Sequence, residues 1–358
     1  MVSPYSVGSM RKMKKIKNLQ MSDIAEIAGV SKSTVSRALA DSPLVNEKTK
    51  NIIKSIASEH NYRVNVAARN FRVKESLRVA VLLPAADDAD WSTSDPFFLE
   101  LIADLAVALD DHGHQLLLTR TTPQPVEWIE DFVHSHQADG VILIGQGSQH
   151  AAINRLAERY RAVSVWGTKM DEDQAYPVVG TDNVLGGERA TQHLLETGRR
   201  RIVFLGHKET PEVEQRLAGY RRAHAEAGVD VDHALVPDYP ESQGDAHQAI
   251  EALVDSKTPF DAVFAISDSI AIRVIRWLHG RGIKVPDDVA VVGYDDIQLA
   301  SYVTPSLTTI RQNRSVGAKI LVDNLLEALD GHNPEKIVLD PQLIIRESSQ
   351  PSGDSHSQ

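Results

Sequence analysis

The chain has 358 residues, 42% of them hydrophobic, with no cysteine and a formal net charge of -11. The lack of cysteine excludes disulfide bonds, thiolate metal sites and cysteine nucleophiles, and is compatible with a reducing compartment. No apolar run reaches about 18 residues and no secretory signal is recognisable, so we expect a soluble, cytoplasmic protein with two or three folded units.

Charge is distributed unevenly along the chain. Residues 1–78 carry 15 lysines and arginines against 6 aspartates and glutamates, whereas residues 79–358 carry 23 against 43. Phosphate attracts the first segment and repels the second, so the N-terminal part is expected to approach nucleic acid first. Residues 1–17 form a basic extension in which Met10 and Met13 are alternative starts.

Residues 21–39 predict two short helices joined by a tight turn. Apolar residues recur at helical spacing on both sides of the turn, and they are Ile24, Ala25, Ile27, Ala28, Val35, Ala38 and Leu39. Gly29 can adopt the left-handed conformation that ends the first helix, and the Ser31 hydroxyl can cap the second. This pattern is typical of a helix-turn-helix.

The second of these helices is expected to enter the major groove of DNA. Its polar face carries short hydroxyl side chains and two cations, which can read base edges or bind phosphates. These residues are Lys32, Ser33, Thr34, Ser36 and Arg37. The alternative is a protein-interaction module of three helices whose polar face is simply solvated.

A third helix is predicted from Asn46 to His60, with Asn46 as its N-cap. The apolar stripe that should cover the first two helices comprises Ile52, Ile53, Ile56 and Ala57. Lys48, Thr49 and Lys50 lie near the start of this helix, where they can contact phosphates. For each of them the alternative is a solvated surface position.

These motifs resemble the DNA-binding domain of the lactose/galactose repressor (LacI/GalR) family. DIAEIAGVS, STVSRAL and the closing HNY stand at the family's spacing within residues 18–62. The resemblance implies that residues 63–77 contain a hinge helix that drives an apolar wedge into the minor groove, with Asn65, Ala68 and Phe71 as contacts. Phe71 stands where the family usually has leucine, which leaves the preferred base step open, and a plain linker is the alternative.

From Leu77 onward, short apolar runs alternate with helical segments, which predicts parallel sheets covered by helices on both faces. The predicted strands are LRVAVLL, HQLLLT, DGVILIG, AVSVW, YPVVG, RIVFLG, DAVFAI and VAVVGY. The predicted helices span residues 97–111, 126–136, 185–197, 212–227, 246–255 and 270–281. About 270 residues of this pattern exceed one such domain, so two lobes are expected.

The order of these elements, ending in GYDDIQLASYVTPSLTTIRQN, resembles the periplasmic-binding-protein-like core of the same repressors. The resemblance implies an effector-binding and dimerisation core over residues 78–347. The lobes that it implies are 78–179 plus 313–340 for lobe one, and 180–312 plus 341–347 for lobe two. The expected fold is thus an N-terminal all-α helix-turn-helix head with a hinge helix, then a two-lobed α/β core of parallel doubly wound sheets. Residues 348–358 are expected to form a disordered tail.

The same resemblance places a small-molecule effector between the lobes, at the carboxyl ends of the strands. A sugar needs charged, bidentate partners for its hydroxyls and a flat apolar surface for its C–H face. The residues at the family's effector positions are Phe97, Phe98, Arg216, Tyr239, Ser267 and Asp295. The alternatives are a surface salt bridge for Arg216, a turn cap for Asp295 and core packing for the phenylalanines; Asp268 is interpreted as a helix cap.

Trp166 and Gly167 depart from the family pattern, which often has an acidic or polar residue where this chain has the glycine. An indole beside a missing carboxylate suggests a stacking platform with room for a bulkier ligand, such as a glucoside. The alternative is a core tryptophan. Glu212 and Glu214 stand where relatives often have neutral or basic residues, which disfavours an anionic ligand.

We therefore predict a sequence-specific, DNA-binding transcriptional regulator of bacteria, in the first place a repressor of sugar-utilisation genes that a mono- or disaccharide releases from its operator. The expected partners are a second copy of the chain and pseudo-palindromic double-stranded DNA, without cofactor, metal or membrane. No nucleotide-binding or nucleophile motif argues for an enzyme. The alternatives are a sugar sensor acting through protein partners, an α/β enzyme with a regulatory head, and a regulator that needs a co-repressor.

Overall fold

The computed structural model describes residues 20–39, 41–60, 62, 77–83, 95–120, 137–146, 149–170, 173–206, 210–237, 247–334 and 336–350. The chain divides into two compact units, Met1–Glu75 and Ser76–Gln358. Several predictions lie outside the described residues, and they concern the extension 1–17, the hinge contacts Asn65, Ala68 and Phe71, the helix at 126–136, and Tyr239.

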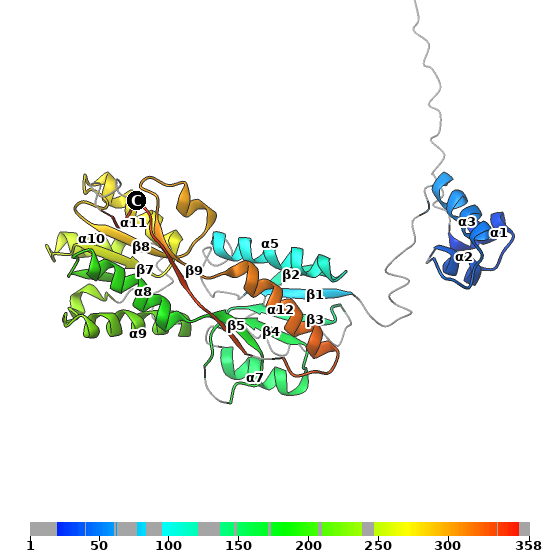
Figure 1. Ribbon diagram of the computed structural model, residues 1–358, viewed down its shortest axis with the longest axis horizontal. Coiled ribbons are helices and arrows are strands. Elements are labelled where there is room, and N and C mark those ends of the chain that lie inside the picture. Colours follow the sequence, from blue (N-terminus) through cyan, green and yellow to red (C-terminus); the bar gives the residue numbers. More distant parts are fainter. Residues whose placement is uncertain are drawn as a thin grey trace, which may run out of the picture. The chain divides into compact units, whose positions relative to one another are not determined.

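The described part of the first unit contains three helices around a small core (Figure 1), α1 (Met21–Ala28), α2 (Lys32–Leu39) and α3 (Glu47–Glu59). The local signals read from the sequence are confirmed. Gly29 has a φ of 65° at the end of α1. The Thr34 amide donates to Ser31 Oγ at 3.1 Å, and the Thr49 amide donates to Asn46 Oδ1 at 2.8 Å. These contacts fix the turn and the start of each following helix.

The core of this unit is narrower than the sequence predicted. Ile24, Val35 and Ile53 are fully buried, but Ile27 is 53% and Ile52 is 47% exposed. A unit of three short helices buries only the centre of each apolar stripe, because a small domain has much surface for its volume. The assignment of Ile27 and Ile52 to the buried face was wrong.

Lobe one of the second unit is built on a six-stranded sheet in the order β10-β5-β4-β3-β1-β2, with every strand pair parallel. Its strands are β1 (Arg78–Leu83), β2 (Gln115–Arg120), β3 (Gly140–Ile144), β4 (Val163–Trp166), β5 (Val178–Thr181) and β10 (Ile337–Leu339). Its described helices are α5 (Pro96–Asp111), α7 (His150–Arg159) and α12 (Arg314–Leu329). Val79 and Val81 of β1 pack in one cluster with α5 and α12, whereas Ala80 and Leu82 pack with α7, so both faces are covered (Figure 1).

Lobe two is built on a five-stranded sheet in the order β11-β9-β8-β7-β6. Its strands are β6 (Ile202–Leu205), β7 (Ala262–Ala265), β8 (Ala290–Asp295), β9 (Thr308–Arg311) and β11 (Gln342–Ile344), of which only β11 runs antiparallel to its neighbour among the described pairs. Its helices are α8 (Asn183–Glu196), α9 (Pro211–Glu226), α10 (His247–Asp255) and α11 (Asp268–Gly280), with short 3-10 helices η2 (His233–Leu235) and η4 (Gln298–Ser301). Ile202 and Phe204 pack with α8 and α9, and Val203 and Leu205 pack with α10 and α11.

The chain passes between the lobes at three places, and hydrogen bonds tie the three passages together. Thr181 Oγ1 donates to the carbonyl of Gln312 at 3.2 Å. The Asp182 amide donates to the carbonyl of Leu339 at 3.0 Å. Asn313 Nδ2 donates to the carbonyl of Asp340 at 3.1 Å. The lobes are therefore joined by a bonded set of three strands rather than by independent linkers.

The prediction that the disordered tail begins at residue 348 was wrong. Ser348 and Ser349 are fully buried. Ser348 Oγ accepts from the Thr308 amide at 2.8 Å, and Ser349 Oγ lies 2.7 Å from Thr308 Oγ1 and 2.7 Å from His193 Nε2. These serines are polar because they form hydrogen bonds inside lobe two. Their polar composition therefore does not indicate an exposed, disordered segment.

Candidate DNA-binding and effector-binding sites

The predicted DNA-reading residues of α2 differ in how far they are exposed. Lys32, Ser33 and Arg37 are exposed, whereas Thr34 and Ser36 are half-buried. Ser31 Oγ lies 2.8 Å from Ser33 Oγ and 2.9 Å from Thr34 Oγ1. The hydroxyls at the start of α2 thus form a connected group, and the exposed cations lie on the same helix.

A hollow of about 390 Å³ lies where the N-terminal ends of α1 and α2 meet. It is lined by Gln20, Met21, Ser22, Lys32 and Ser33. Sequence reasoning assigned the last two and missed the three from the start of α1. The sequence signal that could have placed these three residues at the start of α1 is the capping box. In it, the Gln20 amide donates to Asp23 Oδ2 at 2.7 Å and fixes where α1 begins.

The predicted phosphate contacts at the start of α3 differ from one another. Lys48 is exposed and Thr49 is half-buried. Lys50 is only 6% exposed, and its Nζ lies 2.7 Å from Glu47 Oε1. The placement of Lys50 for phosphate contact was therefore wrong, because one turn of helix pairs it with an acidic neighbour.

In the core, Arg216 is held between α8, α9 and β7. Its Nε donates to Asn183 Oδ1 at 2.9 Å and its Nη1 donates to the carbonyl of Ile266 at 2.5 Å. Only 8% of the residue is exposed. The alternative of a surface salt bridge is contradicted. Arg216 is a buried arginine, and its guanidinium carbon lies over the Tyr294 ring at the end of β8.

Close packing of α8 on α9 brings Arg216 to this position. A Cβ on Gly187 would overlap the Arg216 carbonyl, and a Cβ on Gly219 would overlap the Val184 carbonyl. The two helix backbones can approach this closely only because both positions are glycine. Nothing in the local sequence signalled this contact, because it joins two separate helices.

Asp295 ends β8 with its carboxylate buried. Gln312 Nε2 donates to Asp295 Oδ1 at 2.6 Å. Burial raises the pKa of Asp295 to about 8, while the nearby Arg216 guanidinium acts to lower it and Asp95 acts to raise it. The predicted hydroxyl partners Arg216 and Asp295 are thus brought together at one end of the lobe-two sheet.

The interpretation of Asp268 as the cap of the next helix was wrong, because Ser267 takes that role. The Ile270 amide donates to Ser267 Oγ at 3.3 Å, so Ser267 is the N-cap of α11. Asp268 is fully buried; it accepts from Thr309 Oγ1 at 2.5 Å and from the Ile297 amide at 2.9 Å. Burial raises the pKa of Asp268 well above its ordinary value, and the adjacent Asp295 raises it further.

Lobe one contributes a carboxylate that sequence reasoning missed. Asp95 is 7% exposed and accepts from the Phe97 amide at 2.9 Å as the N-cap of α5. Burial raises the pKa of Asp95, and hydrogen bonds from Phe97 and from Ser269 of lobe two oppose this rise. An Asp before a Pro that opens a helix is a recognisable cap signature, but its approach to lobe two is a tertiary feature.

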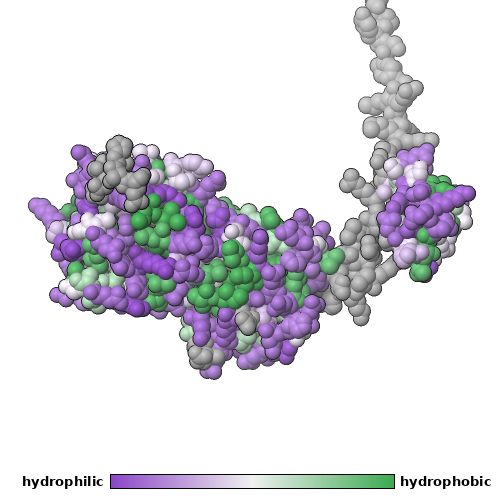
Figure 2. All heavy atoms as spheres, viewed as in Figure 1, coloured by the Kyte–Doolittle hydropathy of each residue, from purple (hydrophilic) through white to green (hydrophobic). Residues whose placement is uncertain are grey.

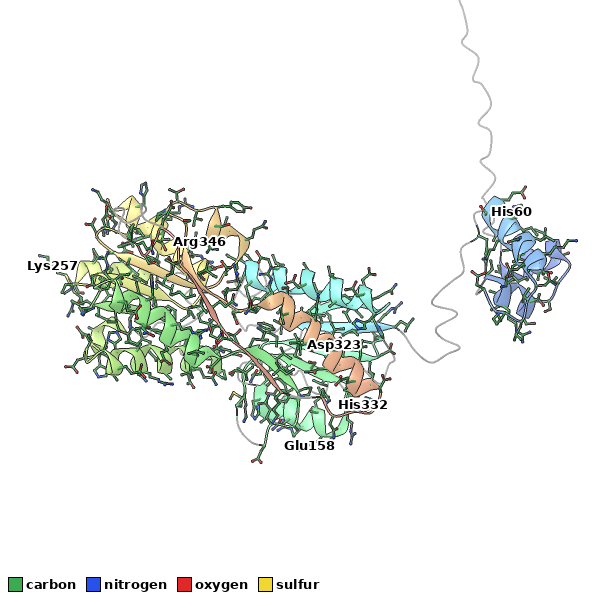
Figure 3. The ribbon with its side chains drawn as sticks, in the orientation of Figure 1. His60, Glu158, Lys257, Asp323, His332 and Arg346 are labelled. Carbon is green, nitrogen blue, oxygen red and sulfur yellow. The ribbon has the colours of Figure 1, made fainter. Side chains whose placement is uncertain are left out.

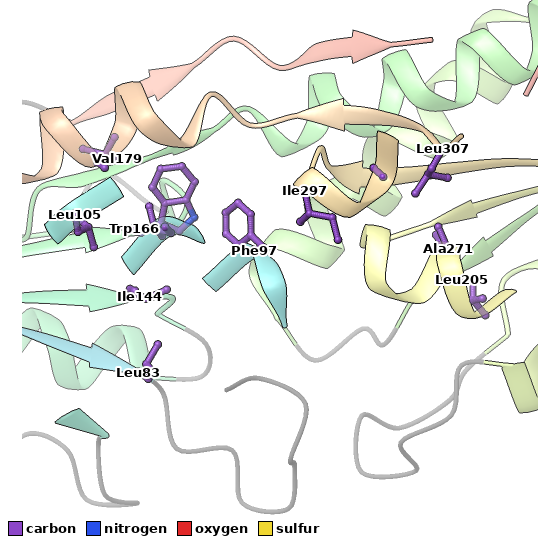
Figure 4. Close-up of a cluster of buried hydrophobic side chains, with 14 of the residues drawn as sticks. Leu83, Phe97, Leu105, Ile144, Trp166, Val179, Leu205, Ala271, Ile297 and Leu307 are labelled. Atoms are coloured by element: carbon purple, nitrogen blue, oxygen red, sulfur yellow. The ribbon is translucent and has the colours of Figure 1, made fainter. Parts of the chain in front are cut away.

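Phe97 and Trp166 lie side by side in the hydrophobic core, with Ile297 of lobe two on the other side of Phe97 (Figure 4). Their ring centroids are 5.8 Å apart, and Phe98 lies 5.6 Å from Phe97 in an edge-on arrangement. Trp166 is 6% exposed, and its indole packs against α12 at Gly317, where a Cβ would overlap it. Phe98 is the more exposed of the two phenylalanines.

The expected room beside Gly167 is occupied. A Cβ at Gly167 would overlap the Gln146 carboxamide. Gln146 Nε2 donates to the Thr168 carbonyl at 2.5 Å, and the Thr168 amide donates back to Gln146 Oε1 at 3.0 Å. The sequence analysis inferred an open space because Gly167 has no side chain. That inference was wrong, because the side chain of Gln146, which follows the neighbouring strand β3, fills the space. Gln146 is a further residue that the sequence did not identify.

The two lobes also touch directly at this end of the strands. Thr168 Oγ1 of lobe one donates to Gln215 Oε1 of lobe two at 2.5 Å, and Gln215 Nε2 donates to the Lys169 carbonyl at 3.3 Å. Burial raises the pKa of Glu212, one turn earlier on α9. Several carboxyl groups thus lie between the two sheets, and burial disfavours the charged form of each.

The described ranges contain neither a cluster of metal ligands nor a membrane-spanning helix. No group of three or more His, Cys, Asp or Glu side chains could hold a metal ion there. In the same part of the chain, no helix is both long and apolar enough to cross a membrane.

Both units match known families. Residues 20–65 match the profile "Bacterial regulatory proteins, lacI family", and residues 191–349 match "Periplasmic binding protein-like domain". The chain is 30% identical over 337 residues to the ribose operon repressor of Haemophilus influenzae, which covers 92% of this chain and 98% of that protein. It is 31% identical over 334 residues to the HTH-type transcriptional regulator CelR of Thermobifida fusca, over 91% of this chain and 96% of the relative.

Solved structures give the same result. The transcriptional regulator CelR–cellobiose complex aligns with a TM-score of 0.67 at 28% identity, over 92% of this chain and 99% of that one. The lac repressor dimer bound to operator and an anti-inducer shares the fold, with a TM-score of 0.78 at 22% identity, over 94% of this chain and 100% of that one. These relatives are regulators, which agrees with the prediction that the chain is not an enzyme. With its helix-turn-helix unit and two-lobed core, the chain belongs to the lacI family of bacterial regulatory proteins.

Proposed function

We propose that the chain binds operator DNA as a homodimer and that a neutral sugar or glycoside, held between the two sheets, changes its affinity for that operator. The observation that carries this proposal is the buried pair Arg216 and Asp295 at the carboxyl ends of β7 and β8. A guanidinium and a carboxyl side by side can donate to and accept from neighbouring hydroxyls of a sugar ring. Repression released by the sugar is the first candidate, and co-repression is the second.

The charges around this pair support a neutral effector. Asp95, Asp268 and Asp295 are all less than a tenth exposed. Burial raises the pKa of each of the three carboxyls. A ligand with a phosphate or carboxylate would add negative charge where negative charge is already disfavoured. Hydroxyl groups avoid that cost, since they can donate to a carboxylate or accept from a protonated carboxyl.

The effector's contacts would come from both lobes. Arg216, Ser267 and Asp295 belong to lobe two, and Phe98 and Asp95 belong to lobe one. A ligand that touches both can favour one relative position of the lobes over another, and only such a preference can shift the equilibrium between DNA-binding and released states. We propose that Trp166 contacts the effector with only the edge of its indole ring, because little of the ring is exposed.

An exposed apolar surface on α5 and η4 is our candidate for the dimer interface. Leu99 is 52%, Leu299 is 46% and Tyr302 is 71% exposed. These side chains flank the hydrogen bond from the Gln298 amide to Glu100 Oε1, 3.0 Å long, which joins the two elements. Hydrophobic patches interrupt the mostly hydrophilic surface of the core unit in Figure 2. A dimer would present two recognition helices to a pseudo-palindromic duplex.

In the proposed complex, α2 lies in the major groove, with Arg37 and Lys32 contacting bases or phosphates and Lys48 contacting phosphate. A regulator of this kind acts where the chromosome is, which makes the bacterial cytoplasm the proposed location. No cofactor takes part in this scheme.

The test is selection of binding sites from random duplexes by the full chain, followed by mobility shifts with a panel of neutral sugars that includes cellobiose and D-ribose. The proposal expects a pseudo-palindromic consensus and a change in affinity of about 5- to 150-fold with one sugar. Arg37→Ala should relax the consensus at one position of each half-site, whereas Lys48→Ala should weaken all duplexes alike. Selection that returns no consensus, together with indifference to every sugar, would refute it.

A further inference from the structure

The effector-binding turn has an unusual backbone. Asp295 has a φ of 120° and Asp296 has a φ of 53°. Neither residue is glycine, and both φ values lie where the Cβ of an L-amino acid is crowded. Two consecutive residues of this kind do not persist unless surrounding contacts hold them.

Two arginines hold the second residue of this turn. The Asp296 side chain is only 7% exposed, and it accepts from Arg311 Nε at 2.6 Å and from Arg346 Nη2 at 2.6 Å. Arg311 comes from the neighbouring strand β9. Arg346 comes from the C-terminal segment that follows β11, over lobe two (Figure 3). Charge-assisted bonds from two directions restrain a carboxylate far more than one exposed ion pair does.

Further bonds fix the backbone on both sides of Asp296. Its amide donates to Thr309 Oγ1 at 3.3 Å, and Thr309 Oγ1 in turn donates to Asp268 Oδ1. The Ile297 amide donates to Asp268 Oδ2 at 2.9 Å. Arg346 is itself fixed by a bond from Nη1 to the Leu307 carbonyl, 2.7 Å long. Asp295, by contrast, has a single side-chain donor among the bonds described, Gln312.

We propose that Arg346 and Arg311 are positioning residues of the effector site, because their bonds to Asp296 hold the left-handed turn that directs the Asp295 carboxyl toward Arg216. The inference rests on the proposed function, since it assigns Asp295 to the effector. Neither arginine touches the ligand. Without the pair, the 295–296 backbone relaxes toward negative φ, and the Asp295 carboxyl moves away from the position that a sugar hydroxyl requires.

The test compares Arg346→Met with a matched control, Arg201→Met. Arg201 also bridges a carbonyl and a carboxylate in lobe two, donating to the Pro259 carbonyl at 2.5 Å and to Asp232 Oδ2 at 2.9 Å. Arg201→Met therefore removes a comparable bridge of lobe two that lies away from the 295–296 turn, and the stability of each variant is measured alongside. Asp296→Asn and Asp296→Ala form a second pair, because asparagine tolerates the left-handed conformation better than alanine does.

The first readout is hydrogen exchange of the ligand-free protein over residues 290–300. We expect Arg346→Met to speed exchange of the Asp296 and Ile297 amides by about 10-fold or more, with Arg201→Met leaving them unchanged. Exchange of these two amides at the wild-type rate in Arg346→Met would overturn the proposal. This readout needs no ligand, so it tests whether Arg346 holds the 295–296 turn even if cellobiose does not bind.

The second readout is calorimetric titration with cellobiose. Arg346→Met and Asp296→Ala should weaken binding by about 10-fold or more, and Asp296→Asn by less. Wild-type affinity in Arg346→Met, beside a large loss in Asp295→Ala, overturns the positioning role and leaves the effector site standing. Wild-type affinity in Asp295→Ala instead refutes the effector site itself, whatever the exchange experiment returns for the arginines.

Discussion

The guanidinium carbon of Arg216 lies 3.7 Å from the centroid of the Tyr294 ring. Tyr294 directly precedes Asp295 in the chain. The Tyr294 hydroxyl donates to Asn183 Oδ1 at 3.3 Å, the same atom that accepts from Arg216 Nε. One buried tyrosine therefore sets the distance between the two residues that we assign to the effector. Burial raises the pKa of Tyr294 to about 12, so its ring stays neutral beneath the cation.

Arg216→Lys tests this arrangement. Lysine keeps the charge but loses the planar fork, the bond from Nε to Asn183 and most of the stacking on Tyr294. We expect effector affinity to fall by about 10- to 100-fold, which corresponds to about 1.4–2.8 kcal/mol. Calorimetric titration measures the change, with Arg222→Lys on the exposed side of the same helix as control. Equal affinities in the two variants would mean that the fork makes no contact with the ligand.

Asp295→Asn should raise the thermal stability of the core. The folded pKa of about 8 exceeds the ordinary value of 3.8, mainly because of burial. The folded state therefore holds this proton more tightly than the unfolded state, and the carboxyl costs stability above pH 3.8, increasingly so until about pH 8. The gain in Tm of the variant should thus be larger near pH 8 than near pH 5, at roughly 2–4 °C for each kcal/mol relieved.

Differential scanning calorimetry at the two pH values checks this prediction, and the same variant should lose its response to the effector. Asp323→Asn, at an exposed position on α12, serves as control. If the variant's gain in Tm were the same at both pH values, Asp295 would not be the group that titrates.

Gly219→Ala should destabilise the core. Its Cβ would overlap the Val184 carbonyl and lie 2.6 Å from the Glu188 amide, so α8 and α9 would have to separate. Overpacking of this kind costs about 1–3 kcal/mol. Urea unfolding gives the loss, and Gly280→Ala, where nothing lies within 4 Å of the added Cβ, is the control. We expect weaker effector binding as well, because Arg216 sits on the displaced helix.

Leu299→Glu should separate the proposed dimer. A charge on the exposed α5–η4 surface leaves the folded protomer intact but would be desolvated in an interface. Sedimentation equilibrium should return a protomer mass for this variant and a dimer mass for the wild type. Val338→Glu, 53% exposed in lobe one, is the control. A dimer in Leu299→Glu would place the interface elsewhere.

Local signals made the first unit predictable from the sequence. Gly29, Ser31 and Asn46 act within three or four residues, so the turn and the helix starts could be read directly. Strands β1 to β8 were equally clear, because each is a short apolar run. Strands β9, β10 and β11 were not predicted, and β10 and β11 are three-residue strands that stay partly exposed. Among the described helices, α7 and α12 were not predicted. The buried residues of α12 spread over a broad face that includes the polar Asn324. Apolar residues therefore do not recur at a clear helical spacing in this segment.

The missed parts of the candidate site depend on contacts between distant segments. Gln146 fills the space at Gly167 from the neighbouring strand, and Asp95 meets Ser269 across the lobes. Arg346 reaches Asp296 over 50 residues of sequence. No pattern of spacing within one element carries such information. Arg216 and Asp295 could be proposed beforehand only because the resemblance supplied their positions.

Coupling between operator and effector is the central claim, and fluorescence anisotropy on the selected duplex measures it most directly. Wild-type chain should bind that duplex with an affinity that falls steeply with salt, and the sugar identified in the panel should change the affinity by about 5- to 150-fold. Asp295→Ala should bind the duplex equally well but show no effect of the sugar. An operator affinity that no sugar alters in the wild-type protein, or no binding to any duplex at low ionic strength, would contradict the account.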